Sequence, residues 1–187
     1  LSIKGRLGAI NFPIPQTGLE LVWNNLLPTR EYTAHVIRDS ANVLSNGSIN
    51  YGRTDNTDLD RINKPEMRGK PVEGPMAFSL TKTLLPERDK GGVSVAIEPT
   101  NFAENKRLTW AYDTGTRRVR QIPEFGFDQP MSGTSGRMTI DSDRLFNGSP
   151  ERYNWKLVGK KEMFIPANAY KIHQPTVKYA NLLTPQH

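Results

Sequence analysis

The amino-acid sequence predicts a mainly β (α+β) protein built on an antiparallel sheet with up-and-down strand order. Several segments in the middle of the chain alternate between apolar and polar residues, as half-buried strands do. The connections between them are too short for a crossover helix and carry the Gly and Asp that tight turns require. With 14 Pro, 15 Gly and only 36% hydrophobic residues, the composition favours a sheet with long loops over a helical bundle.

One amphipathic helix is expected ahead of the strands. Thr17 and Glu20 have the spacing of a capping box, and Pro28 ends the helix. Its apolar residues share one helical face and need a sheet or another helix to cover them. They are Leu19, Val22, Trp23, Leu26 and Leu27.

The strands follow in sequence order. A hairpin through the Asn46-Gly47 turn is expected to join residues 32–38 to residues 49–53. Further strands are expected at residues 77–85, 93–98, 107–113, 117–122 and 152–158. Residues 54–75 are expected to form a long loop with a short helical turn at 58–62, and short helices are expected at 139–146 and 177–183.

Bulky apolar residues share faces in two of these strands. Leu108, Trp110 and Tyr112 lie on one face of their strand, which we expect to be buried. Tyr153, Trp155 and Leu157 share a face in a later one. Two interpretations stay open: these residues bind an apolar ligand, or they form the core that covers the helix around Trp23.

The sequence contains no recognisable catalytic or metal-binding pattern, and no cofactor is expected. Cys is absent, and His35, His173 and His187 are scattered without ligand spacing. Ser135 resembles part of a nucleophile elbow, but Arg137 stands where that turn needs Gly. We therefore expect a protein that is not an enzyme.

The net charge of +6 raises the alternative of nucleic-acid binding. Arg118 and Arg120 point to the same side of a strand and could contact phosphate. A stacking platform needs exposed aromatic residues, however, and the face with Trp110 is expected to be buried. Solvated outer-face arginines are the preferred interpretation, and no nucleic-acid partner is expected. No apolar run approaches the ~20 residues of a membrane helix, so membrane contact is expected to be peripheral at most.

Three segments carry a family resemblance: residues 18–25 (GLELVWNN), 108–128 (LTWAYDTGTRRVRQIPEFGFD) and 145–171 (LFNGSPERYNWKLVGKKEMFIPANAYK). They resemble a bacterial family of unknown function labelled outer-membrane lipoprotein-sorting-like, related to the LolA-type lipoprotein carriers. The resemblance implies a strongly curved antiparallel sheet, an unclosed barrel with short helices against its concave face. It also implies a periplasmic or outer-membrane-associated location in a Gram-negative bacterium. Family members extend past both ends, so residues 1–187 are expected to form a single LolA-like domain that is incomplete relative to the family.

Together these points predict a non-enzymatic carrier or adaptor that binds a hydrophobic ligand, such as a lipid, an acyl chain or a lipoprotein, in a sheet–helix cavity. An alternative is a structural or interaction module of an envelope export complex, and nucleic-acid binding is a less favoured one. The candidate ligand-binding residues are Leu108, Trp110, Tyr112, Tyr153, Trp155 and Leu157, with Arg118 and Arg120 as candidate contacts for an anionic group.

Overall fold

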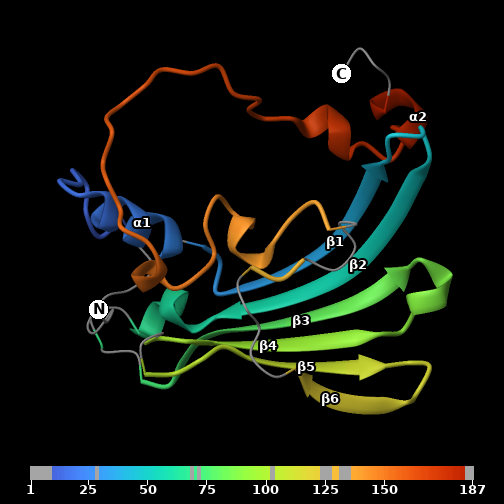
Figure 1. Cartoon of the computed structure of the whole chain (residues 1–187), viewed down its shortest axis with the longest axis horizontal. Coiled ribbons are helices and arrows are strands. Elements are labelled where there is room, and N and C mark those ends of the chain that lie inside the picture. Colours follow the sequence, from blue (N-terminus) through green and yellow to red (C-terminus); the bar gives the residue numbers. More distant parts are fainter. Residues whose placement is uncertain are drawn as a thin grey trace. The chain divides into compact units, whose positions relative to one another are not determined.

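The computed structural model describes residues 10–27, 30–67, 70, 73–101, 104–122, 128–130 and 136–183. The chain divides into two compact units, Leu1–Leu157 and Val158–His187. The first unit holds the helix α1 (Gly18–Leu26) and the whole sheet (Figure 1). The second holds the short helical segments η6 (Tyr170–His173) and α2 (Tyr179–Leu182).

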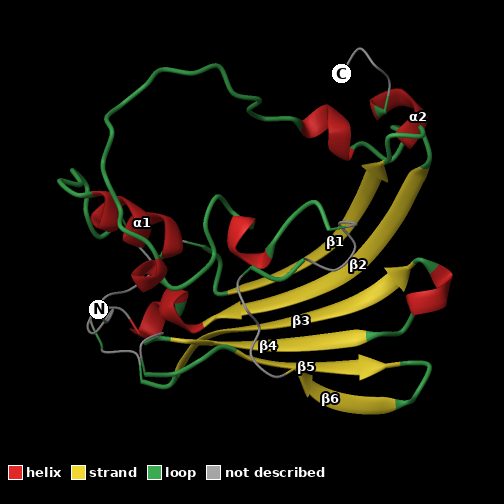
Figure 2. Cartoon of the chain, in the orientation of Figure 1, coloured by secondary structure: helices red, strands yellow, loops and turns green. Residues whose placement is uncertain are grey.

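The first unit is organised around one six-stranded antiparallel sheet, which confirms the predicted fold class (Figure 2). Its spatial order is the same as its sequence order, so every neighbouring pair is joined by a local connection. The sheet is open, with β1 and β6 at its edges, and its strands bend visibly (Figure 1). The strands are β1 (Thr33–Val43), β2 (Ile49–Asp60), β3 (Pro75–Leu85), β4 (Val93–Pro99), β5 (Leu108–Asp113) and β6 (Arg118–Ile122).

The first hairpin is much longer than the sequence indicated. β1 and β2 pair without interruption from Thr33 opposite Leu59 to Val43 opposite Ile49. The loop predicted from residue 54 was therefore wrong as far as residue 60, where a short helical turn, η1 (Arg61–Asn63), begins. Polar residues of this stretch bond across the sheet instead of facing a core: Thr81 Oγ1 donates to Asn56 Oδ1 at 2.9 Å. A strand held by polar contacts shows no apolar alternation.

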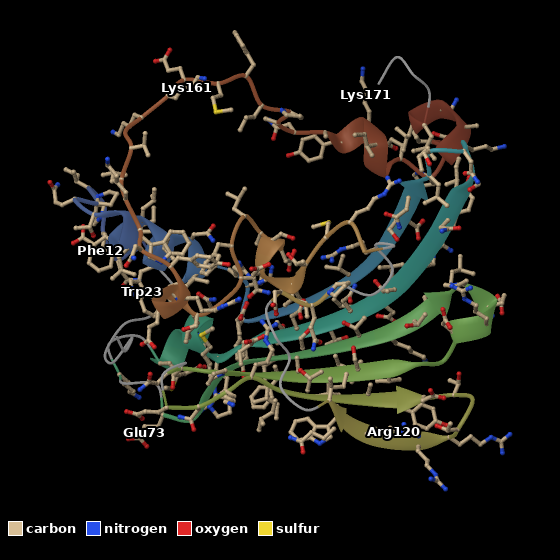
Figure 3. All side chains as sticks on the ribbon, viewed as in Figure 1. Phe12, Trp23, Glu73, Arg120, Lys161 and Lys171 are labelled. Carbon is tan, nitrogen blue, oxygen red and sulfur yellow. The ribbon has the colours of Figure 1, made fainter. Side chains whose placement is uncertain are left out.

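Helix α1 begins and packs as its sequence predicts. Thr17 and Glu20 form the capping box, which confirms that assignment. The core of the first unit lies where α1 meets η1: Trp23, Leu27 and Ile62 are buried together. Phe12, Leu19, Leu26 and Met76 pack around them. Figure 3 shows Phe12 and Trp23 at this end of the sheet.

The later part of the chain is less regular than predicted. Residues 139–146 form only the turn η4 (Ile140–Ser142), because Arg144 and Leu145 adopt positive φ angles that a helix does not allow. The strand predicted at residues 152–158 is absent: η5 (Pro150–Arg152) is followed by extended chain without a ladder. The helix predicted at 177–183 is confirmed only as the short α2. The remaining turns are η2 (Pro65–Met67) and η3 (Glu87–Asp89).

Truncating Leu27, the buried residue that caps the C-terminus of α1, should destabilise the first unit strongly. Leu27 is 2% exposed, so Leu27→Ala leaves a cavity and should lower the free energy of unfolding by about 2–4 kcal/mol. Leu21→Ala in the same helix is the matched control, because Leu21 is 49% exposed and should lose less than about 1 kcal/mol. Denaturation followed by tryptophan fluorescence measures both values. Equal losses would show that the core is elsewhere.

Candidate apolar binding face of the sheet

The pairing register sorts the strand residues into two faces, because directly opposed residues in an antiparallel pair point to the same side. Trp110 is opposite Val95, and Val95 is opposite Leu80. Large apolar side chains therefore form one continuous face over β3 to β6, which we call the aromatic face. Its members are Phe78, Leu80, Val93, Val95, Ile97, Leu108, Trp110, Tyr112 and Val119.

The aromatic face is partly open to solvent. Leu80, Leu108, Tyr112 and Val119 are exposed, and the other members are half-buried. The prediction that Leu108, Trp110 and Tyr112 lie on the buried face of β5 was therefore wrong. Thr109, which points to the other side, is only 6% exposed. Sequence alternation shows that two faces differ, but the rest of the fold decides which of them is covered.

The opposite side of the sheet is called the polar face, and over β3 to β5 it carries mostly short side chains and is the better covered one. These side chains include Ser79, Thr81, Ser94, Ala96, Thr109 and Ala111. Asn56 and Thr109 are its buried members. Near one end of this face, Glu98 and Arg107 form a largely buried ion pair at 2.5 Å. Arg107 Nη2 also donates to Asn147 Oδ1 at 3.1 Å, which ties the segment after η4 to this side. Leu108, Trp110 and Tyr112, which were expected to line a sheet–helix cavity, lie on the other face.

The arginines predicted to contact an anionic group share one side of β6, as expected. Arg118 is opposite Asp113 and Arg120 is opposite Ala111, so both belong to the polar face. Both are exposed, and Figure 3 shows Arg120 on β6. They do not share a face with Trp110, so the structure does not bring the predicted apolar and anionic contacts together on one surface of the sheet.

A different cation, Lys82, lies on the aromatic face. Lys82 is exposed and directly opposite Val93, which in turn is opposite Tyr112. The sequence analysis missed it. The signal was present, because period-two alternation through β3 places Phe78, Leu80 and Lys82 on the same side.

Tyr153 and Trp155 belong to a separate aromatic cluster outside the sheet. Both rings make edge contacts with Phe146, at centroid distances of 5.8 and 4.8 Å, and with each other at 5.5 Å. Trp155 Nε1 donates to the Pro150 carbonyl at 2.7 Å. Leu157 follows as a half-buried residue. The six predicted ligand-binding residues thus fall into two groups, of which only Leu108, Trp110 and Tyr112 lie on the sheet.

A partly buried charged cluster lies at the end of β2. Burial raises the pKa of the Asp60 carboxyl above its usual range, and the attraction of Arg30 and Arg144 opposes this shift only in part. Burial, followed by repulsion from Arg144, lowers the pKa of Arg30. The cluster therefore combines both signs of charge.

His35 on β1 contacts Asp55 Oδ1 at 2.7 Å in an exposed pair. Within the described ranges, no cluster of three or more His, Asp or Glu residues could hold a metal ion. Ser135 and His187 lie outside the described residues, as does the side chain of His173. No helix in the described part of the chain is long and apolar enough to cross a membrane.

Comparison with known proteins places the chain in a family. The model of the family described as protein of unknown function (DUF1329) matches residues 1–187. The chain belongs to this family. The DUF1329 chain is also 34% identical over 176 residues to the uncharacterized protein PA3922 of Pseudomonas aeruginosa. That match covers 94% of this chain but 39% of the relative, so the DUF1329 chain spans about two-fifths of the relative's length. No solved structure matches it.

Replacing Asp60 should reveal a pH-dependent gain in stability. Because its pKa is raised, the native state retains a proton that the unfolded state has released, so ionised Asp60 weakens the fold as pH rises through that interval. Asp60→Asn should therefore be more stable than the parent at pH 7, and the difference should shrink as pH falls below about 4. Chemical denaturation at both pH values checks this sign.

Asp39→Asn is the matched control, because hydrogen bonding from Arg53 lowers the pKa of Asp39, whereas burial raises the pKa of Asp60. Its effect should not follow the pattern of Asp60→Asn. An Asp60→Asn variant that is destabilised equally at pH 7 and at acid pH would show that attraction to Arg30 and Arg144 outweighs burial.

Proposed function

We propose that this chain is a non-enzymatic carrier or adaptor that binds an anionic amphiphile, such as a lipid or an acyl chain, on the aromatic face. The observation that carries the proposal is the continuity of large apolar side chains over four strands, several of them exposed to solvent. Contiguous apolar surface on a soluble domain marks binding sites, because water solvates it poorly. A ligand bound here needs no covalent chemistry.

The dimensions of the face suit a hydrocarbon chain. Neighbouring strands lie about 4.7–4.9 Å apart, so the distance from β3 to β6 is about 14 Å. On this face, side chains form rows that run across the strands. Each row begins at Phe78, Leu80 or Lys82 of β3 and continues into β4 and β5. Each methylene that leaves water against these rows contributes about 0.8 kcal/mol.

Lys82 gives the aromatic face a polarity along the strands. It occupies the row that contains Val93 and Tyr112, and its neighbour in that row on β2, Asp55, contacts His35 at 2.7 Å. Phe78, at the other end of that face of β3, has apolar partners in Ile97 and then Leu108. An ammonium group at one end of an apolar surface complements a carboxylate or phosphate headgroup at one end of an acyl chain. We assign the anionic contact to Lys82 instead of Arg118 and Arg120, because those two arginines belong to the polar face.

A second candidate is an interaction module that covers the same face with another polypeptide. The open sheet favours it, since both of its edges can also contact a partner. The relationship to LolA-type carriers, the periplasmic or outer-membrane-associated location and a link to an envelope export system belong to this proposal. Their support is the resemblance carried by residues 18–25, 108–128 and 145–171.

Palmitate binding to paired surface variants tests the proposal. Leu80 on the aromatic face and Val36 on the polar face are 42% and 43% exposed, so neither substitution should unfold the sheet. Leu80→Gln should weaken palmitate binding about tenfold, because it removes part of the apolar contact. Val36→Gln should leave it unchanged. Isothermal titration measures both. A parent chain that binds no palmitate, or equal losses in both variants, would overturn the proposal.

Lys82→Gln separates the headgroup contact from the apolar contact. It should weaken binding of palmitate by about threefold to tenfold and leave binding of the uncharged alcohol of the same chain length unchanged. Lys90→Gln is the control, because Lys90 pairs with Glu87 in the β3–β4 turn and is outside the aromatic face. Equal effects on acid and alcohol would remove Lys82 from the site.

A further inference from the structure

β1 is the longer of the two sheet edges, and no strand of the described sheet pairs with its outer side. Within the described part of the chain, β1 pairs only with β2, along eleven residues. β6, at the other edge, has five. Strands this long at a sheet edge are open to backbone pairing unless charged side chains, proline or a bulge block them. The segment Thr33–Val43 contains no lysine or proline, and its register with β2 has no shift. Of its charged residues, Asp39 is already paired with Arg53 of β2.

The hydrogen bonds at the two ends of β1 identify the backbone groups that face outward. Tyr32 accepts a hydrogen bond from the Asp60 N–H at 2.8 Å, and the Leu44 N–H donates to Ser48 at 2.8 Å. Even-numbered residues therefore bond toward β2. Because the direction alternates at each residue of a strand, the odd-numbered residues direct their N–H and C=O groups to the free edge. They are Thr33, His35, Ile37, Asp39, Ala41 and Val43.

We propose that β1 pairs antiparallel with β1 of a second copy of this chain, about a twofold axis at Ile37. In this register Ile37 is opposite its own counterpart, and His35 is opposite Asp39 in both directions. Thr33 is then opposite Ala41. All of these are odd-numbered residues, so the outward backbone groups of each copy meet those of the other in about ten hydrogen bonds.

Side-chain charge selects this register over its neighbours. Moving the axis one residue along the strand places Arg38 opposite Arg38, and moving it two residues places Asp39 opposite Asp39. Like charges in directly opposed positions are unfavourable. Moving it one residue the other way, to Val36, avoids these contacts but loses the match of His35 with Asp39. The axis at Ile37 is therefore the register that avoids opposed like charges and places the imidazole of His35, a hydrogen-bonding group, opposite the carboxylate of Asp39.

Existing contacts within each copy extend this match. His35 Nε2 contacts Asp55 at 2.7 Å, and Arg53 donates two hydrogen bonds to Asp39 at 2.5 and 2.8 Å. Across the axis, the His35–Asp55 pair of one copy adjoins the Asp39–Arg53 pair of the other. Ile37, which is 60% exposed in the single copy, becomes covered by its counterpart. The twofold axis runs perpendicular to the sheet, so both aromatic faces lie on the same side.

Single cysteine substitutions test the register directly, because the chain contains no Cys. At the axis, opposed Cα atoms are about 5.5 Å apart, which is within disulfide range. Ile37→Cys should therefore form a covalent dimer under mild oxidation. Thr33→Cys is the matched control on the same edge and side. In this register the Thr33 residues of the two copies are offset by eight positions along the strands, which is about 27 Å. It should stay monomeric on a non-reducing gel.

Sedimentation velocity of the unmodified chain over a range of concentrations measures association without a cross-link. The parent should form a dimer, and Ile37→Pro should raise the dissociation constant at least tenfold, because proline removes an outward N–H that β2 does not use. A parent that is monomeric at all concentrations would overturn the proposal. So would equal cross-linking of the Ile37→Cys and Thr33→Cys variants. No ligand is present, so these outcomes are independent of palmitate binding.

Discussion

The rest of the structure depends on the register of the antiparallel ladder, because the side-chain period of a strand is two residues. The pairing of Val95 with Trp110 places large apolar residues of β4 and β5 on one side, and the same register sends Ala96 and Thr109 to the other. A shift by one residue in any strand would mix the two sets. The division into an aromatic face and a polar face is therefore one property of the whole sheet.

Coverage of the polar face carries an energetic cost that the aromatic face avoids. Thr109 Oγ1 and Glu98 Oε2 are buried and make no hydrogen bond to the described residues. Buried polar groups without partners reduce stability. The larger apolar residues lie on the aromatic face, where a ligand or partner buries them under the proposed function.

The compact core is small and lies to one side of this arrangement. Trp23, Leu27 and Ile62 anchor α1 to the end of the sheet where β2 leads into η1. Most of the aromatic face lies on β4 to β6, and none of the buried members of that core cluster comes from these strands. The sheet is therefore held together largely by its own ladder, and its surface can serve contacts that the core does not need.

Local pattern was sufficient wherever one strand or one turn of helix contains its own signal. The sequence by itself determined the antiparallel class, the capping box of Thr17, the positions of β3 to β6 and the common face of Leu108, Trp110 and Tyr112. These features depend on neighbours within a few residues. The full length of β2 was missed because its polar residues are held by side-chain hydrogen bonds: Asn56 accepts from Thr81 of β3 and donates to Thr54 within β2.

Only the tertiary structure decided which face of the sheet is covered. Coverage depends on long-range contacts such as the hydrogen bond from Arg107 to Asn147, which are 40 residues apart in the chain. The tertiary structure also separated Tyr153 and Trp155 from Trp110, by packing them on Phe146. Contacts between residues far apart in the chain leave no periodic trace in either segment. Alternation shows that two faces differ, whereas long-range packing determines which one meets solvent.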